Sequence, residues 1–145
     1  MATAAGRPVR GALIARAYGP RPQEIVFQYD PEYVRRHVTR SANGGPPRDV
    51  IELTLEFDAL DDDPVSPVPT PAAVARVIDL LVGLPGDDAS VSLQLGRRTT
   101  AVRVCEVSVV EERFDTDMRP VRAVVDLVLE VEPRRPTESA LGGSE

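Results

Sequence analysis

Few residues of this chain are of types that carry out catalysis, and those few lie far apart in the sequence. His37 is the single histidine, and Cys105 is the single cysteine. A histidine can activate a cysteine or serine as a nucleophile when the two side chains share a hydrogen bond. No recognisable motif surrounds either residue here. We therefore expect His37 to be a surface or strand residue, Cys105 to be a small core residue, and the chain not to be an enzyme.

Carboxylates can hold metal ions and glycine-rich loops can hold phosphates, but their spacing in this chain favours neither role. The aspartates at positions 61–63 lack the spaced ligands and the glycine of a calcium-binding loop, so we expect a solvated charge run there. Asp115 and Asp117 are typical of a hairpin turn, in which an aspartate bonds its own backbone. Gly44 and Gly45 precede two prolines rather than a helix, unlike a phosphate-binding loop. With no histidine–cysteine cluster for zinc, the sequence predicts neither a metal nor a cofactor.

Composition and charge are those of a single globular domain. The 145 residues are 42% hydrophobic and 28% charged, with a formal net charge of −6. An acidic chain lacks the basic surface that contacts a phosphate backbone, so we expect no nucleic-acid binding. A single cysteine cannot form an internal disulfide, which fits a reducing compartment. No apolar run is long enough to span a membrane and no signal peptide is recognisable, so we expect a cytoplasmic protein without membrane insertion.

The elements that must position these residues are mostly strands, and the longest pattern predicts an antiparallel hairpin near the C-terminus. Residues 121–131 alternate apolar and polar side chains and are rich in valine, which is typical of a half-buried strand. Residues 102–114 are also strand-like, but their apolar parity changes between Val104 and Cys105. Such a phase change predicts a bulge or a sharp bend. The turn-forming run at residues 115–120 joins the two arms.

The rest of the chain is expected to cover this hairpin. Further strands or extended segments are predicted at residues 11–17, 24–29, 33–39, 51–57 and 91–95. Residues 41–47 and 58–69, rich in glycine, proline and aspartate, are predicted to be loops. The expected organisation is a flexible N-terminus at residues 1–9, a single β domain at residues 10–132 and a flexible tail at residues 133–145.

One helix is predicted, at residues 71–82. Thr70 is a suitable N-cap, and Pro71 occupies the first helical position, where its missing N–H is not needed. Gly83 and Pro85 end the segment. Four apolar residues recur at helical spacing and are expected to pack on the sheet: Val74, Val77, Ile78 and Leu81.

Four motifs, in this order, carry a resemblance. Residues 24–32 read Glu-Ile-Val-Phe-Gln-Tyr-Asp-Pro-Glu, and residues 51–58 read Ile-Glu-Leu-Thr-Leu-Glu-Phe-Asp. The helical segment of residues 72–84 ends in Leu-Pro, and residues 112–123 combine a hairpin turn with the start of the last strand. Together they resemble tube-type domain proteins of contractile injection systems, which are phage-tail-like particles. The resemblance covers residues 13–131 and is to the tube-type domain without the LysM module that longer members carry.

The resemblance implies a mainly β fold, a β-sandwich or half-open antiparallel barrel similar to a tail tube, with one packed α-helix. It implies an inner baseplate or tube-adaptor protein whose copies form a six-fold, homo-oligomeric ring between the inner tube and the spike hub. Its partners would be the tube protein, the spike or hub protein and other baseplate proteins. A tube-end cap or tube protein of the same particle stays open, as does a non-enzymatic small β domain that binds a peptide or small ligand.

In the family that the chain resembles, neighbouring subunits meet at strand edges and projecting hairpins. Two loops are therefore assembly-interface candidates, and we expect the hairpin tip and residues 40–49 to become ordered only against neighbouring subunits. The candidate residues are Asp115, Thr116, Asp117, Met118, Arg119, Pro120, Asn43, Gly44 and Gly45.

Overall fold

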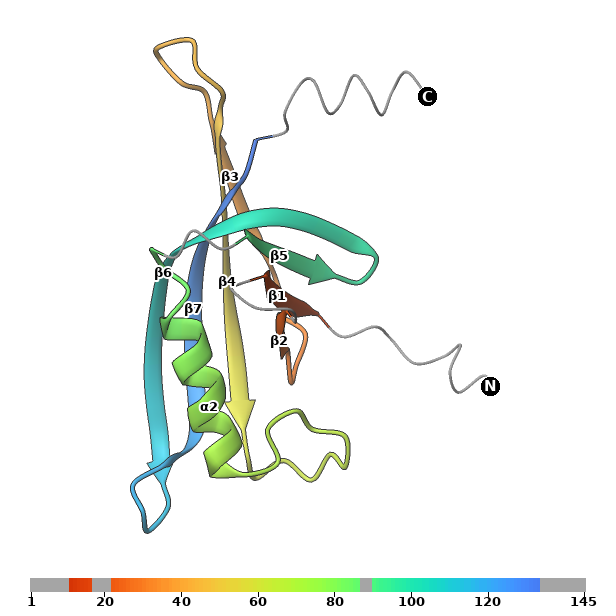
Figure 1. Ribbon diagram of the computed structural model, residues 1–145, viewed down its shortest axis with the longest axis vertical. Helices are drawn as coiled ribbons and strands as arrows, with labels where there is room; N and C mark the ends of the chain where they lie inside the picture. The colour runs from red at the N-terminus through yellow and green to blue at the C-terminus, as the bar shows by residue number, and fades with distance from the viewer. Residues whose placement is uncertain (1–10, 17–21, 87–89, 134–145) are drawn as a thin grey trace, which may run out of the picture.

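The computed structural model describes residues 11–16, 22–86 and 90–133 of the chain. Seven strands in these ranges form one antiparallel sheet in the order β2-β1-β5-β6-β7-β4-β3, accompanied by one helix, α2 (Figure 1). The fold is therefore mainly β with one helix, as the sequence predicts. The strands are β1 (Ala12–Arg16), β2 (Gln23–Val26), β3 (Arg35–Thr39), β4 (Arg48–Asp58), β5 (Ser90–Leu95), β6 (Arg98–Phe114) and β7 (Pro120–Val131), and α2 is Pro71–Val82.

Strand β6 belongs to both halves of the sheet. Its first residues, from Arg98 to Val102, pair with β5, and its residues from Val102 to Phe114 pair with β7. The strand curves between these two partners, so that β5, β1 and β2 turn across the long strands β4 and β7 (Figure 1). Buried side chains of both halves, such as Leu13 and Leu127, belong to one hydrophobic core.

The predicted phase change in β6 is confirmed as a bulge. The pairing of β6 with β7 shifts register between Val104 and Glu106, and Cys105 is the additional residue. Val104 is buried, whereas Cys105 is exposed. The expectation that Cys105 is a core residue is therefore wrong, because a bulge re-aims the side chain of its extra residue and leaves it outside the ladder.

The helix follows its sequence signals closely. The Oγ1 atom of Thr70 accepts a hydrogen bond from the backbone N–H of Ala73 at 3.1 Å, and Pro71 begins the helix. The helix packs on β7 and, to a smaller extent, on β6. Three of the four expected residues are buried, namely Val74, Ile78 and Leu81. Val77 is only partly buried, because it lies at the margin of the apolar stripe.

A buried glutamine, two residues after the end of β2, links that segment to the end of β4. Gln28 is the single buried polar residue among those described, with 5% of its surface exposed. Its side-chain amide donates to the backbone oxygen of Asp58 at 2.9 Å, and its side-chain oxygen accepts from the backbone N–H of Asp58 at 2.6 Å. These bonds bring the two outer regions of the curved sheet together where no strand pairing joins them.

Candidate assembly interface

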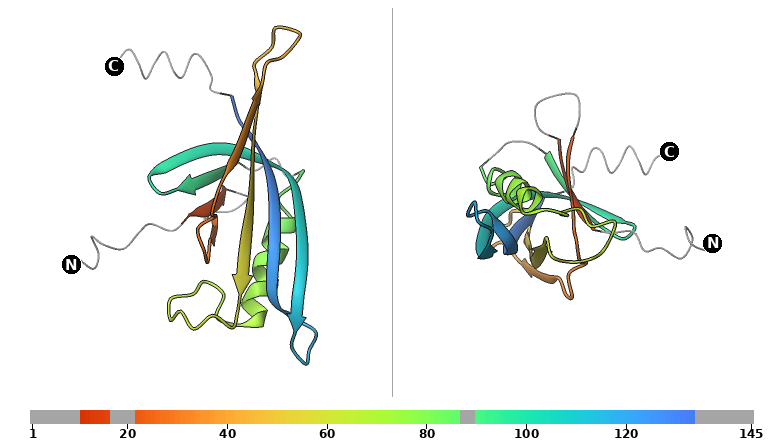
Figure 2. Two further views of the ribbon diagram at one scale, coloured as in Figure 1. Left: turned by 180° about the vertical axis from the view of Figure 1, so that it is seen from behind. Right: turned by 90° about the horizontal axis from the view of Figure 1, so that it is seen from below.

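The candidate assembly residues lie in two hairpins at opposite ends of the molecule. Figure 1 shows the loop between β3 and β4 at one end of the long axis and the turn between β6 and β7 at the other. The view from behind gives the same arrangement (Figure 2). The structure therefore does not bring residues 43–45 and residues 115–120 together into one site; they form two separate projections.

The turn between β6 and β7 is organised around the carboxylate of Asp115. One oxygen of this carboxylate accepts the backbone N–H groups of Asp117 and Arg119, each at 2.9 Å. The Arg119 guanidinium bonds the second oxygen at 3.1 Å and the Asp117 carboxylate at 3.2 Å. Donation from the backbone N–H of Arg119 is the main cause that holds the pKa of Asp115 below its usual value.

This turn forms from its own hydrogen bonds. Besides the carboxylate contacts, the backbone N–H of Asp115 donates to the Arg119 oxygen at 3.0 Å, and that of Met118 donates to the Asp115 oxygen at 2.9 Å. Met118 has a positive φ of 63°. These local bonds stabilise the turn within a single subunit, and the expectation that residues 115–120 become ordered only against neighbouring subunits stays a prediction.

The tip presents an apolar side chain and buries another. Met118 is 70% exposed, and Phe114 is 45% exposed at the end of β6. Thr116 is also exposed, whereas Pro120 is buried where β7 begins. A projecting methionine adapts well to irregular partner surfaces. A contact at this tip would therefore bury the exposed apolar surface of Met118.

The hairpin of β3 and β4 presents a different surface. All five residues of β3 are exposed, including His37, as expected, and Val38, which is 59% exposed. The Arg36 guanidinium forms an ion pair with the Asp49 carboxylate across the two strands. In the loop, Asn43, Gly44 and Gly45 are exposed, and Gly44 has a φ of +77°, which a glycine adopts without strain.

The sheet leaves backbone edges open for a partner. Strands β2 and β3 are the two edge strands. β3 pairs with β4 only as far as Glu52, so β7 is the single described strand that pairs with the part of β4 from Leu53 to Phe57. Open edges of this kind are templates for pairing with another chain.

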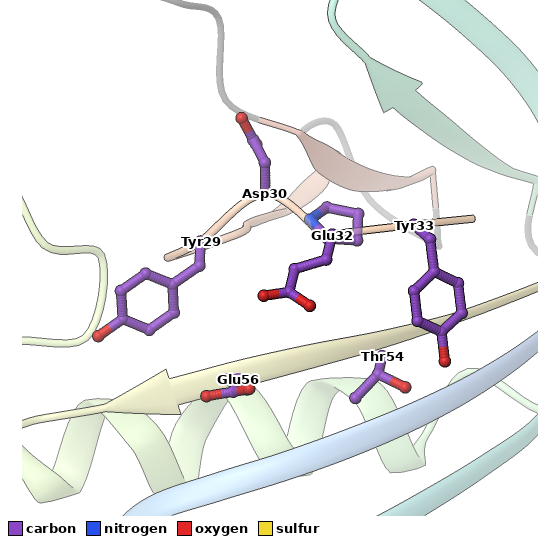
Figure 3. A pocket seen from close by; sticks show the side chains of 7 residues that line it. Tyr29, Asp30, Glu32, Tyr33, Thr54 and Glu56 are labelled. Carbon is purple, nitrogen blue, oxygen red and sulfur yellow. The ribbon is translucent and has the colours of Figure 1, made fainter.

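Beside this open part of β4 lies a groove that the sequence reasoning did not anticipate. The groove has a volume of about 480 Å³. The segment that leads from β2 to β3 forms one wall, and β4 forms the floor (Figure 3). Glu32 and Glu56 both point into the space between the rings of Tyr29 and Tyr33. The lining residues are Tyr29, Asp30, Pro31, Glu32, Tyr33, Thr54 and Glu56.

Neighbouring contacts fix the walls of this groove. The backbone N–H of Gly11 donates to the Asp30 carboxylate at 3.1 Å, and Gly11 has no room for a Cβ, which would lie 2.6 Å from the Phe27 ring. The Tyr29 hydroxyl donates to the Asp61 carboxylate. This bond, more than partial burial, raises the pKa of Tyr29 to about 12.

One signal in the sequence could have located the groove. Aromatic residues make up only 4% of the chain, yet two of its three tyrosines, Tyr29 and Tyr33, lie within five residues of each other and flank Asp-Pro-Glu. The alternation of residues 24–29 placed Tyr29 on the same side as Ile25 and Phe27. The structure buries Ile25 and Phe27 but leaves Tyr29 40% exposed, because β2 ends at Val26.

The single histidine and the single cysteine lie on strands that are not neighbours in the sheet. His37 lies in β3 and Cys105 in β6, and both are exposed. No group of three or more histidine, cysteine or acidic residues within the described ranges could hold a metal ion. The aspartates of residues 61–63 bond their own loop instead, as Asp61 accepts the backbone N–H of Asp63 at 3.0 Å.

Among the residues that the structure describes, no helix has both the length and the apolar character needed to cross a membrane. The described surface presents open strand edges, two projecting hairpins and an acidic groove, and open edges can pair with another chain. The chain matches no known family, and no curated protein matches it.

Proposed function

We propose that this chain is a structural, non-enzymatic subunit of a contractile injection system, an inner baseplate or tube-adaptor protein that assembles into a six-fold ring between inner tube and spike hub. The proposal joins the resemblance of four ordered motifs to the shape of the domain. Its partners are further copies of the chain, the tube protein, the hub or spike protein and other baseplate proteins. Assembly takes place in the cytoplasm, without nucleic acid and without insertion into a membrane.

The observation that carries the proposal is the placement of two projecting hairpins at opposite ends of one small domain (Figure 1). A subunit within a stack must contact one neighbour above and another below, and the turn at Met118 and the loop at Gly44 reach in these two directions. The open edges of β2 and β3 leave room for lateral neighbours in the same ring.

The test is incorporation into particles. Particles sedimented from lysed producing cells should contain the chain together with tube and sheath proteins, in a copy number that is a multiple of six. Met118→Arg should reduce incorporation, because the side chain projects from the tip, and Val82→Arg, at a 50% exposed position on the helix, serves as the matched control. A chain that stays in the supernatant as a monomer would contradict the proposal.

The groove in Figure 3 favours a second candidate, a small β domain that binds a peptide. A groove of about 480 Å³ beside an open strand edge can accept an extended segment. The two candidates separate experimentally. Tyr33→Ala removes one wall of the groove and should abolish peptide binding, whereas a ring that uses only the two tips and the edges of β2 and β3 should still assemble.

A further inference from the structure

The open part of strand β4 directs backbone groups into the groove beside it. The backbone N–H of Ala59 donates to β7, whereas the N–H and C=O groups of Asp58 bond the Gln28 side chain instead. Backbone groups alternate in direction along an antiparallel strand, and the register between β4 and β7 runs to Asp58 without a shift. The N–H and C=O groups of Thr54 and Glu56 therefore point away from β7, as those of Asp58 do, and towards the groove.

Within the described ranges, these two N–H and two C=O groups have no hydrogen-bond partner. The pairing of β3 with β4 ends at Arg35 and Glu52, and no hydrogen bond joins the backbone of Thr54 or Glu56 to the far wall of the groove. Backbone groups that are covered without a partner cost free energy. A ligand that fills the groove must therefore bond them, and an extended peptide does so with the spacing of a strand.

The side chains around this edge are acidic. Glu32 and Glu56 point into the space between the rings of Tyr29 and Tyr33 (Figure 3). The Arg122 guanidinium bonds one oxygen of the Glu56 carboxylate, at 3.2 and 3.3 Å, and leaves the other oxygen without an ion pair. For Glu32, the described residues provide no ion pair at all. The groove therefore holds carboxylate oxygens that can accept from a further cation.

The charges at the two ends of the groove keep it negative. At one end, Arg35 lies opposite Glu52 in the register of β3 and β4, so a carboxylate offsets its charge. At the other end, the hydrogen bond to Asp61 is the main cause that raises the pKa of Tyr29 to about 12, and the charges of neighbouring carboxylates raise it further. A negative potential of this kind repels an anionic side chain and attracts a cationic one.

We propose that the groove binds an extended segment of a partner protein, which adds to the open edge of β4 and carries an arginine or lysine opposite Glu56. Residues directly opposite each other project their side chains on the same face of a sheet. The cation would therefore lie against the carboxylates of Glu56 and Glu32, and the flanking rings of Tyr29 and Tyr33 suit contact with it. The inference rests on the peptide-binding function proposed above for the groove, and it specifies the backbone pairing and the charge of the peptide.

The buried face of β4 restricts the neighbours of this cation. The residues before and after it would project on the face of Leu55 and Phe57, which are 1% and 0% exposed. Other side chains already cover that face, so only small residues fit beside the cation. The volume of about 480 Å³ suits a short segment of this kind. The expected motif is a basic residue between two small ones.

Nuclear magnetic resonance of the full chain tests the pairing directly. The probe is the blocked peptide acetyl-Thr-Ala-Arg-Ala-Thr-amide. We expect the backbone amide signals of Thr54 and Glu56 to shift during the titration and their hydrogen exchange to slow, because both N–H groups gain acceptors. Methylation of the arginine backbone nitrogen should weaken binding about five- to ten-fold, the effect of one lost hydrogen bond. Methylation of the next alanine nitrogen, which points away from β4, is the matched control.

Charge is tested on both partners. The peptide with glutamine in place of arginine should bind about ten-fold more weakly, and the difference should shrink at about 1 M salt, where the Debye length is about 3 Å. Glu32→Gln should weaken binding of the arginine peptide about five-fold. Glu24→Gln, at an exposed position on β2 outside the groove, is the matched control and should leave the affinity unchanged.

The outcomes separate this inference from the function on which it rests. Arginine and glutamine peptides that bind equally well would overturn the inference and leave peptide binding intact. Acetyl-arginine amide that binds as tightly as the whole peptide would indicate a cation site without strand addition and would overturn both. Absence of any shift at Thr54 and Glu56 with millimolar amounts of either peptide would also overturn both. Incorporation of Met118→Arg into particles tests the particle role independently.

Two results without added peptide would assign the groove a different occupant and overturn the inference. Amide shifts of Thr54 and Glu56 that depend on protein concentration would identify a second copy of the chain. Shifts of the same amides on deletion of residues 1–9 would identify the N-terminal segment of the chain itself.

Discussion

At the scale of single residues, Tyr29 shows how one contact sets a chemical property. Its hydroxyl donates to the Asp61 carboxylate, and its ring is one wall of the groove. A phenolate at this position would face that carboxylate without the donated hydrogen, so the neutral form is favoured in the folded state. At Cys105, the position in the fold outweighs the residue type. A cysteine is usually buried, but this one is exposed because it is the extra residue of a bulge.

The tyrosine contact predicts a late titration. Tyr29 should ionise at a pKa of about 12, above the ordinary value of 10.0, and Asp61→Asn should bring it back towards that ordinary value. Because the folded pKa is raised, the stabilisation is fully present below about pH 10 and is lost as the pH rises through about 12. Ultraviolet absorbance of tyrosinate measures the titration, and Tyr29→Phe should remove its last component. A final component that survives in Tyr29→Phe would contradict the assignment.

At the scale of elements, the helix and the hairpin turn are stabilised in different ways. Helix α2 begins at Pro71, directly after its N-cap Thr70. Apolar packing on β7 holds the helix in place. The turn between β6 and β7 has exposed side chains and is held by polar bonds to Asp115. Loss of packing should therefore destabilise the whole domain, whereas loss of the turn bonds should act locally.

For the helix, we predict that Leu81→Ala destabilises the domain by about 2–5 kcal/mol, the usual range for a buried leucine. Leu81 is fully buried in the core. Chemical denaturation measures the change, and Val82→Ala, at the neighbouring exposed position, should alter the free energy of unfolding by less than about 0.5 kcal/mol. Equal effects of the two substitutions would show that the buried face has been assigned incorrectly.

For the turn, we predict that Asp115→Ala increases hydrogen exchange at Asp117 and Arg119, whose backbone N–H groups bond this carboxylate. Thr116→Ala, at an exposed position in the same turn, should leave the protection unchanged. Because the pKa of Asp115 is lowered in the folded state, its contribution is present above the ordinary pKa of 3.8 and is lost as the pH falls through the folded value. Carbon-13 titration of the carboxyl group gives that value, and a pKa above 3.8 would refute the arrangement.

At the scale of the whole molecule, one side chain links the two outer regions of the curved sheet. Gln28 lies nearly buried and bonds both backbone groups of Asp58, a residue on a strand that its own segment never joins by pairing. A side chain thus replaces strand pairing at this point. The arrangement also fixes the segment that leads into Tyr29 and so shapes the groove.

We therefore predict that Gln28→Leu costs about 2 kcal/mol of stability, since it leaves the backbone groups of Asp58 without these two bonds. The loss should be accompanied by a change in the Tyr29 titration, because both residues lie on the same segment. Gln23→Leu, on the exposed edge strand β2, is the matched control and should change stability by less than about 0.5 kcal/mol. Retained stability in Gln28→Leu would mean that closure depends on the apolar core alone.

Much of the local structure was predictable from the sequence. The alternation in β4 and β7, the capped start of α2 and the phase change in β6 are all confirmed. Each depends on residues close together in the chain, where the period of side-chain placement follows directly from backbone geometry. The two candidate interface loops were likewise predicted as loops from their glycine, proline and aspartate content.

The sequence alone therefore determined the set of elements, which is a mainly β chain with one helix. It also determined an acidic composition with few residues of the types used in catalysis. The tertiary structure decided which strands are neighbours, that β6 serves both halves of the sheet, that Cys105 faces outward and that Gln28 reaches Asp58. It also decided that Tyr29 and Glu56 share a groove and that the two hairpins lie at opposite ends. These features depend on contacts between residues distant in the chain, and side-chain period, a local property, carries no information about which distant strands pair.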